Sequence, residues 1–186
     1  NYFFHLIWMI YYEQINDLEK SEDHADLLIK NLESRPDILG EIKYRYMGEL
    51  NNIIAILCQN KKMKKAKEAM SKLLKIQDWQ LNNTEKNILA NCITLAYSNL
   101  LNGFRIIKQQ EEGLKIATQA EIFLNNNIVY PYNKSALHFN LSTTYLSLGN
   151  YKQAHIWNTL LLNEPIEQYS EDGHALSRLF NIIIHY

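Results

Sequence analysis

Lysines are concentrated in one short stretch of the chain, which makes it the strongest local signal for chemistry. Seven of the residues between positions 61 and 75 are lysine, and Glu68 is the one acidic residue among them. Such a concentration of positive charge attracts phosphate groups or acidic partners. The candidate basic patch consists of the four lysines that follow one another most closely, Lys61, Lys62, Lys64 and Lys65.

The apolar residues of the same stretch favour a second interpretation. Met63, Ala66, Met70 and Leu73 recur at intervals of three and four, the period of a helix with one buried side. The lysines fall mostly off this stripe, where their charged ends remain in water. We therefore expect a solvated helix face, with nucleic-acid binding through the lysines as the weaker alternative.

Catalytic motifs are not found in the sequence. It has no glycine-rich phosphate loop, nucleophile elbow, His-Glu-x-x-His or Cys-x-x-Cys. No two of its six histidines are three or four residues apart, as a metal site on one helix face would require. Cys58 and Cys92 are too few for a disulfide framework, so we expect reduced, buried thiols in a cytoplasmic protein. We predict neither an enzyme nor a bound cofactor or metal.

Composition places the chain among globular proteins. Its 186 residues are 47% hydrophobic and carry a formal net charge of −1. This excludes intrinsic disorder, and the near-zero charge argues against wholesale nucleic-acid binding. The apolar run at residues 2–12 spans roughly 16 Å as a helix, about half the hydrocarbon thickness of a bilayer. We therefore expect no membrane span.

Apolar residues recur at three and four along most of the chain, which predicts an all-α fold. Several helix ends have local causes: Ser21 is expected to start one helix, Thr84 to cap another, and Pro131 to occupy a first turn. Gly149 makes a turn, and Pro36 and Pro165 end helical segments. The expected helices cover residues 2–18, 21–34, 39–58, 62–77, 84–103, 108–126, 132–147, 150–163 and 169–186.

Residues 135–165 carry a specific motif. Leu141, Ser142 and Tyr145 lie on one expected helix, Gly149 lies in the turn that follows, and Ala154 lies on the next helix. This segment resembles one tetratricopeptide repeat (TPR), with Tyr151 and Pro165 also in place and His138 where the family has a tryptophan. The resemblance implies a right-handed superhelix of about four antiparallel helix pairs plus a terminal helix.

Weaker copies of the motif lie upstream. Ala25, Ala66 and Gly113 take the place of Ala154, at intervals of 41, 47 and 41 residues. The usual period of the family is 34 residues, so helices or linkers are longer here. We treat residues 1–186 as a single repeat domain and expect it to be part of a longer chain, because repeats bury their core against neighbours.

The resemblance also implies a site. In the family the first helix of each pair lines a concave groove, and some members hold peptides there through asparagine and basic residues. An asparagine amide can bond a peptide backbone, and an arginine can hold a carboxylate. In this register the groove residues are Asn51, Asn102, Arg105, Phe139 and Thr143.

Charge is divided unevenly between the first two pairs. Residues 1–40 hold 3 basic and 8 acidic groups, whereas residues 41–80 hold 9 basic and 4 acidic groups. We expect these opposite charges to steady the packing of neighbouring pairs or to orient a partner. The two ends of the chain are apolar and lack caps, so self-association through them is also expected.

Together these observations predict a non-catalytic module that binds a protein or peptide, or acts as a scaffold, through the concave groove. The alternatives are a sensor or regulatory repeat domain of a larger bacterial regulator and, less favoured, nucleic-acid binding through the helix at residues 61–75.

Overall fold

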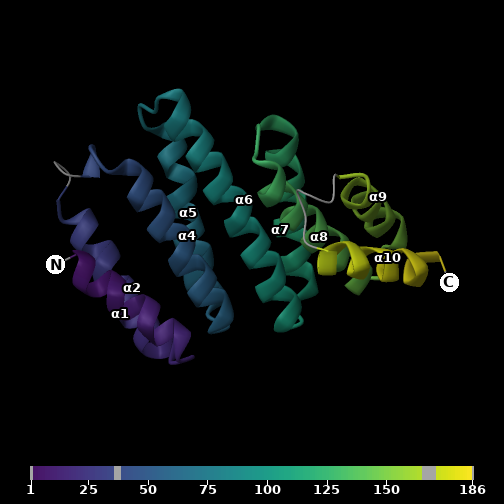
Figure 1. The fold of residues 1–186 in the computed structure, drawn as a ribbon, viewed down its shortest axis with the longest axis horizontal. Coiled ribbons are helices and arrows are strands. Elements are labelled where there is room, and N and C mark those ends of the chain that lie inside the picture. Colours follow the sequence, from purple (N-terminus) through teal and green to yellow (C-terminus); the bar gives the residue numbers. More distant parts are fainter. Residues whose placement is uncertain (1, 36–38, 165–170, 186) are drawn as a thin grey trace. The chain divides into compact units, whose positions relative to one another are not determined.

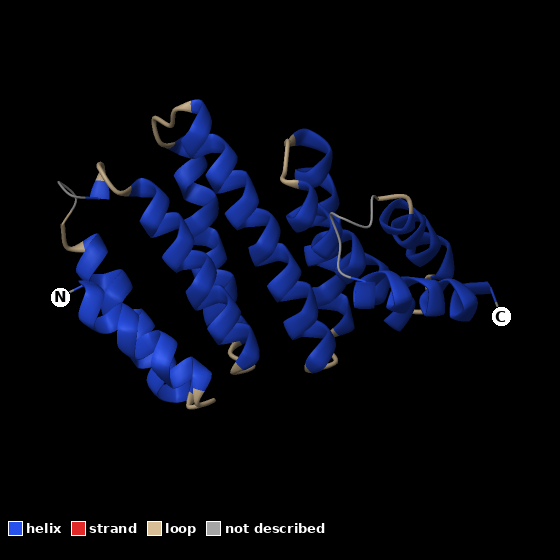
Figure 2. Cartoon of the chain, viewed as in Figure 1, coloured by secondary structure: helices blue, strands red, loops and turns tan. Residues whose placement is uncertain are grey.

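The chain folds as an all-α protein, as predicted. The computed structural model describes residues 2–35, 39–164 and 171–185, and over these residues it has nine α-helices and no strand (Figure 1, Figure 2). Contacts divide the chain into two compact units, Asn1–Ala96 and Tyr97–Tyr186. The predicted ends at Pro36 and Pro165 lie outside the described residues.

The first unit is built from helices that pack on their neighbours in sequence. Helix α1 packs against α2, α2 against α4, and α4 against α5 (Figure 1). A 3-10 turn at Ile76–Asp78 follows α5. The α-helices are α1 (Tyr2–Gln14), α2 (Leu18–Glu33), α4 (Lys43–Gln59), α5 (Met63–Lys75) and the start of α6 (Asn83–Ile106).

The second unit contains the end of α6 and four further helices. Helix α7 packs against α8, α8 against α9, and α9 against α10. Asn158 on α9 donates to the Ser177 carbonyl on α10 at 2.9 Å, and both residues are buried. The bounds are α7 (Gln110–Asn126), α8 (Pro131–Ser147), α9 (Tyr151–Leu162) and α10 (Glu171–His185).

Four tight turns have the same backbone conformation and join α1 to α2, α4 to α5, α6 to α7 and α8 to α9. Each contains one residue in the left-handed region, with φ between 58° and 71°: Asn16, Lys61, Lys108 and Gly149. Its amide donates to the carbonyl three residues earlier, and the next amide donates to the carbonyl five residues earlier, at 2.8–3.2 Å. This is the Schellman pattern that ends a helix. The chain is therefore four helical hairpins, with α10 in addition.

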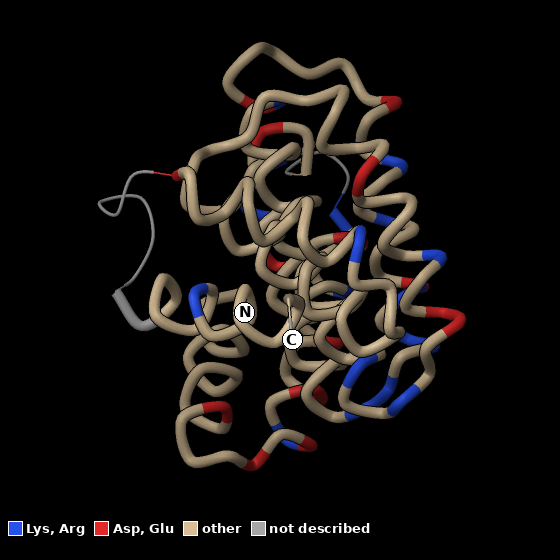
Figure 3. Tube along the Cα trace, turned by 90° about the vertical axis from the view of Figure 1, so that its right-hand side faces the viewer, with Lys and Arg blue, Asp and Glu red and all other residues tan. Residues whose placement is uncertain are grey.

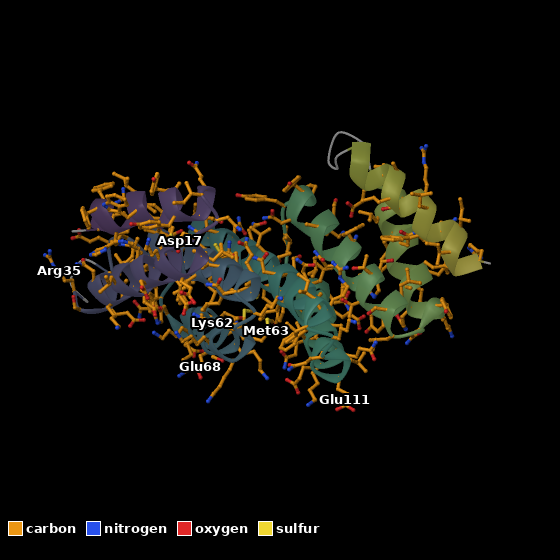
Figure 4. The ribbon with its side chains drawn as sticks, turned by 90° about the horizontal axis from the view of Figure 1, so that it is seen from below. Asp17, Arg35, Lys62, Met63, Glu68 and Glu111 are labelled. Carbon is orange, nitrogen blue, oxygen red and sulfur yellow. The ribbon has the colours of Figure 1, made fainter. Side chains whose placement is uncertain are left out.

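The residue after each turn begins the second helix of its hairpin. These N-cap residues are Asp17, Lys62, Gln109 and Asn150, and their φ values all lie between −84° and −89°. Figure 4 labels two of them, Asp17 and Lys62. Only Asp17 and Asn150 accept an amide hydrogen bond through the side chain, so the shared geometry does not depend on a capping side chain.

Aligning the four turns brings buried residues into register. Four residues after the N-cap, each hairpin has a small buried residue: Ser21, Ala66, Gly113 and Ala154. Seven residues before the turn residue, the facing first helix has Met9, Ile54, Leu101 and Ser142, which are also buried. Each hairpin therefore has a small, buried residue at the position equivalent to Ala154, where a small side chain lets two helices pack closely.

This register corrects the sequence analysis in the first hairpin. Ser21, not Ala25, occupies the position of Ala154, and its hydroxyl donates to the Met9 carbonyl at 3.0 Å. In the fourth hairpin the Ser142 hydroxyl donates to the Ala154 carbonyl at 3.1 Å, so the same bond runs in the opposite direction. Ser21 and Ala25 are both small and buried and lie about one helical turn apart, so residue type alone does not distinguish the two registers. The intervals between hairpins become 45, 47 and 41 residues.

At two helix starts the cap is a different residue from the predicted one. Helix α2 begins at Leu18 after the cap Asp17, so Ser21 lies inside the helix rather than at its start. Before α6 the cap is Asn82, not Thr84: its side chain accepts from the Glu85 amide at 2.9 Å, and Glu85 accepts from the Asn82 amide at 2.8 Å. This reciprocal pair is a capping box. Pro131 is at the start of α8 and Gly149 is in the turn, as predicted.

The close contact in the fourth hairpin gives a direct test of this register. Ala154→Leu adds three carbon atoms where none of the alanine is exposed, so we expect a loss of about 1–3 kcal/mol in unfolding free energy. Lys152→Leu adds the same side chain on the exposed face of α9 and should change stability by less than about 0.5 kcal/mol. Urea unfolding of both variants measures the difference. Equal stabilities would contradict the alignment of the hairpins.

Candidate functional site

The lysine-rich stretch forms α5 and the turn just before it. Two of its lysines, Lys62 and Lys65, are bound to one buried carboxylate. Glu22 on α2 is only 3% exposed. Lys62 Nζ lies 2.6 Å from one carboxylate oxygen and Lys65 Nζ lies 2.7 Å from the other. Asn60 donates a third hydrogen bond, at 3.0 Å. Much of the patch therefore holds the second hairpin to the first.

The ionisation of Glu22 fits this role. Burial by itself would raise its pKa, but the hydrogen bonds from Lys62, Lys65 and Asn60 outweigh burial and lower the pKa below its usual value. The same contact raises the pKa of Lys65. Both groups are therefore charged at neutral pH. Before binding a phosphate, Lys62 and Lys65 would have to break their contacts with Glu22.

A second carboxylate repeats the arrangement farther along α2. Glu33 Oε1 accepts from Lys72 Nζ at 2.8 Å and from the Tyr46 hydroxyl at 2.7 Å. These contacts join the acidic first hairpin to the basic second one. That they steady the packing of the two hairpins stays a prediction. Basic and acidic positions accordingly lie interspersed along the trace in Figure 3.

The Glu22 contact has a measurable energetic consequence. Glu22→Gln removes the charge and weakens three hydrogen bonds, while Lys62 and Lys65 can still be hydrated. We expect a loss of about 1–2 kcal/mol in unfolding free energy. Glu19→Gln removes a charge from the exposed side of the same helix and should have little effect. Denaturant unfolding followed by circular dichroism compares the two, and a Glu22→Gln variant as stable as Glu19→Gln would contradict the structural role.

The other two patch lysines differ from Lys62 and Lys65. Lys61 is the left-handed turn residue, and both Lys61 and Lys64 are exposed. Within the described residues neither makes a salt bridge. The structure thus separates the four predicted patch residues into two that join hairpins and two that face solvent.

Once the turns are aligned, Asn51 is equivalent to Phe139 and Asn102 to Thr143, whereas Arg105 has no counterpart among the predicted groove residues. The five residues also lie in different units. Asn51 is on α4 in the first unit, whereas the other four are in the second. The Asn51 side chain is partly buried, and its Oδ1 atom is buried with no hydrogen-bond partner among the described residues.

Asn102 and Arg105 form a pair at the end of α6. The Arg105 guanidinium donates to Asn102 Oδ1 at 2.6 Å, and Arg105 is exposed while Asn102 is partly buried. The bond holds the arginine in one orientation. The guanidinium has further N–H donors besides the one in this bond, and their geometry suits a planar anion such as a carboxylate.

Phe139 and Thr143 are packed against other residues, in contrast to the exposed Arg105. The Phe139 ring lies against Phe180 of α10, with centroids 5.6 Å apart. Thr143 is buried, and its hydroxyl donates to the Asn140 carbonyl of its own helix at 3.1 Å. Helix α10 thus covers part of the face that was predicted to line a groove in the fourth hairpin.

A pocket of about 220 Å³ lies beside Arg105, between the α6–α7 turn and the end of α8. It brings together two cations, Arg105 and Lys108, and the amide side chains of Gln109 and Gln110 at the start of α7. Gln110 donates to the Ser147 carbonyl at 3.1 Å, which ties the two sides of the pocket together. Thr144 also lines it; its Oγ1 atom is buried and has no partner among the described residues. The remaining walls are Phe104, Gly113, Ser147 and Leu148.

This pocket gathers several polar and charged groups within the second unit. The charge of two cations and the positive end of α7 favour an anion, and the guanidinium geometry favours a carboxylate. Sequence analysis identified Arg105 but missed Lys108, Gln109 and Gln110. These three residues follow Arg105 at the left-handed turn between α6 and α7. That turn could be recognised only by its equivalence to the turn in the fourth hairpin, where the left-handed residue is Gly149.

His138 and Cys58 are buried packing groups, as predicted, whereas Cys92 is only partly buried. His138 is 2% exposed and packs against Trp157, with ring centroids 5.3 Å apart. Burial raises the pKa of Cys58 to about 12 and that of Cys92 to about 11, so both thiols are protonated and unreactive. Among the described residues, no group of three or more His, Cys, Asp or Glu is arranged to hold a metal ion.

Helices α1 and α10 each expose a row of apolar side chains. Met9 is the single buried residue of α1. Across the described part of the chain, no helix combines the length and apolar character needed to cross a bilayer. The self-association expected from these apolar helices stays a prediction. The large exposed apolar residues are Phe3, Phe4, Ile7, Trp8, Ile10 and Tyr11 on α1, and Leu176, Leu179, Ile182 and Ile183 on α10.

Comparison with known proteins adds no family to this description. The chain matches no protein-family model, no curated protein and no solved structure. The TPR resemblance therefore rests on the sequence motif and on the four equivalent turns.

Proposed function

We propose that the chain is a non-catalytic module that binds a protein or peptide, built as a TPR-like array of four hairpins. The right-handed superhelix and its concave groove belong to this proposal as implications of the resemblance. A sensor or regulatory domain of a larger bacterial regulator would use the same binding site, so it is a more specific form of the same proposal.

The observation that supports it best is the Asn102–Arg105 pair, whose arginine lines the 220 Å³ pocket. Asparagine and a basic residue on the first helix of a hairpin are the groups with which some TPR domains hold peptides. Here the arginine is held in place by the asparagine, and Lys108 adds a second cation from the turn. A carboxylate on an extended peptide is the ligand that these groups fit.

Nucleic-acid binding through α5 receives less support. Lys62 and Lys65 are bound to Glu22 and Lys72 is bound to Glu33, so reaching phosphates would require breaking contacts between hairpins. Such binding would also weaken steeply as salt concentration rises.

The test is an array of short peptides in two forms, one ending in a free carboxylate and one amidated, with affinities measured by fluorescence anisotropy. We expect a subset to bind in the carboxylate form and to weaken on amidation. Arg105→Gln should lower the affinity for that subset by about 10- to 100-fold, because it removes a charge-assisted contact worth roughly 1.5–3 kcal/mol.

Lys152→Gln is the matched control, since it removes an exposed charge from α9 in the same unit. It should bind as the unchanged protein does. Binding that is insensitive to both Arg105→Gln and amidation would contradict the site. Retention of RNA or DNA at low salt that is lost in a Lys61→Gln, Lys64→Gln double variant would instead favour the nucleic-acid alternative.

A further inference from the structure

Two histidines on different helices of the first hairpin meet through the same ring nitrogen. His5 on α1 and His24 on α2 place their Nδ1 atoms 3.1 Å apart. They are 19 residues apart in sequence and lie on different helices, so the spacing of residues along one helix does not reveal the pair. Both rings are partly exposed, so the contact is within reach of solvent.

The separation of the two nitrogens equals that of two ligands on one metal ion. Imidazole nitrogens bind Zn²⁺ at about 2.0–2.1 Å, so two ligands at right-angled to tetrahedral geometry are about 2.8–3.4 Å apart. The observed 3.1 Å lies inside this interval. In the metal-free protein one ring shares its Nδ1 proton with the other. An ion would replace that proton between the two nitrogens after the donor ring shifts its proton to Nε2.

The surroundings hold both rings in this arrangement. Phe4 meets the His5 ring edge-on, with centroids 5.3 Å apart. Tyr12 and Trp8 stack on His24 at interplanar angles of 17° and 18°. The hydrogen bond from Ser21 to the Met9 carbonyl fixes the two helices one turn away. The aromatic contacts and this hydrogen bond therefore hold the two nitrogens close together before any ion arrives.

We propose that His5 and His24 chelate a divalent transition-metal ion of the zinc, nickel or copper class. The two imidazoles supply two ligands, and water or a donor from a bound partner completes the coordination. Imidazole favours these metals over magnesium or calcium, which prefer oxygen ligands. The bound ion joins α1 to α2 and so stabilises the first hairpin.

A calorimetric titration of the untagged chain with Zn²⁺ tests the proposal. We expect one ion per chain, and at least a tenfold loss of affinity in both His5→Asn and His24→Asn. Asparagine keeps a polar atom near the Nδ1 position, so each variant retains a neutral partner for the remaining histidine. Circular dichroism of the variants verifies that the helices are intact. With Cu²⁺ in place of Zn²⁺, the electron paramagnetic resonance spectrum should show coupling to two nitrogens.

A second pair of histidines supplies the control. The His155 and His185 rings lie with centroids 4.8 Å apart in the second unit, crossed at 75°. The double variant His155→Asn, His185→Asn should bind Zn²⁺ as the unchanged chain does. Loss of binding in this variant, or no Zn²⁺ binding by the unchanged chain, would overturn the proposal and leave the His5–His24 contact as a structural hydrogen bond.

Discussion

Phe104→Ala is expected to lower the unfolding free energy by about 3–5 kcal/mol, the largest effect of any single substitution considered for this chain. Phe104 is 2% exposed and, among the residues that the structure describes, is the largest of the fully buried side chains. It occupies the position four residues before the left-handed turn residue, equivalent to Tyr12, Leu57 and Tyr145 in the other hairpins. A cavity at this point removes contacts to both helices of the hairpin.

The neighbouring glycine makes collapse of that cavity difficult. A Cβ atom on Gly113 would lie 3.6 Å from the Phe104 Cβ atom, so α6 and α7 are already in close contact there. Ile106→Ala is the matched control, because Ile106 is on the same helix and 51% exposed. It should cost less than about 1 kcal/mol. Thermal and urea unfolding measure both variants, and a small effect of Phe104→Ala would contradict the core position.

Acidification is expected to destabilise the protein through His138. Burial, with a smaller contribution from Lys134, lowers the pKa of His138 from 6.5 to about 4. The ring is therefore neutral at pH 7, and its 3.0 Å approach to Glu164 is not an ion pair at that pH. Between pH 6.5 and 4 the unfolded chain binds a proton at this site while the folded chain does not, so stability falls as pH falls.

The size of this loss of stability follows from how far the pKa of His138 is lowered. At pH 5 the His138 contribution amounts to about 2 kcal/mol, and below pH 4 it reaches about 3 kcal/mol. Glu164 acts in the opposite direction, because burial raises its pKa and the folded chain takes up that proton first. Comparing the unchanged chain with His138→Phe isolates the histidine, since Glu164 is present in both.

Urea unfolding at pH 7.5, 6 and 5 gives the measurement. The unchanged chain should lose about 2 kcal/mol more than His138→Phe between pH 7.5 and 5. His185→Gln, which alters an exposed histidine, should follow the unchanged chain. Parallel pH dependence for the unchanged chain and His138→Phe would mean that the ring is protonated without disturbing the fold.

The helices themselves could be predicted because their signals are local. Apolar spacing, Pro131 and Gly149 gave the positions of the helices to within a few residues. The fourth hairpin was recognised in detail because its turn residue is glycine, which adopts the left-handed conformation without strain. In the other three hairpins that residue is Asn16, Lys61 or Lys108. Sequence gives no comparable signal for a left-handed lysine, and the register of the first hairpin was misplaced by one helical turn.

Sequence by itself determined the all-α class, the small residue at each close helix contact after the first hairpin, and the opposite charges of the first two hairpins. These depend on residue types at short, regular intervals, which a helix converts directly into faces. Tertiary structure decided which groups meet: Glu22 with Lys62 and Lys65, Phe139 with Phe180, and His5 with His24. Such contacts join separate helices, and their distances follow from how helices pack, a property that no local spacing encodes.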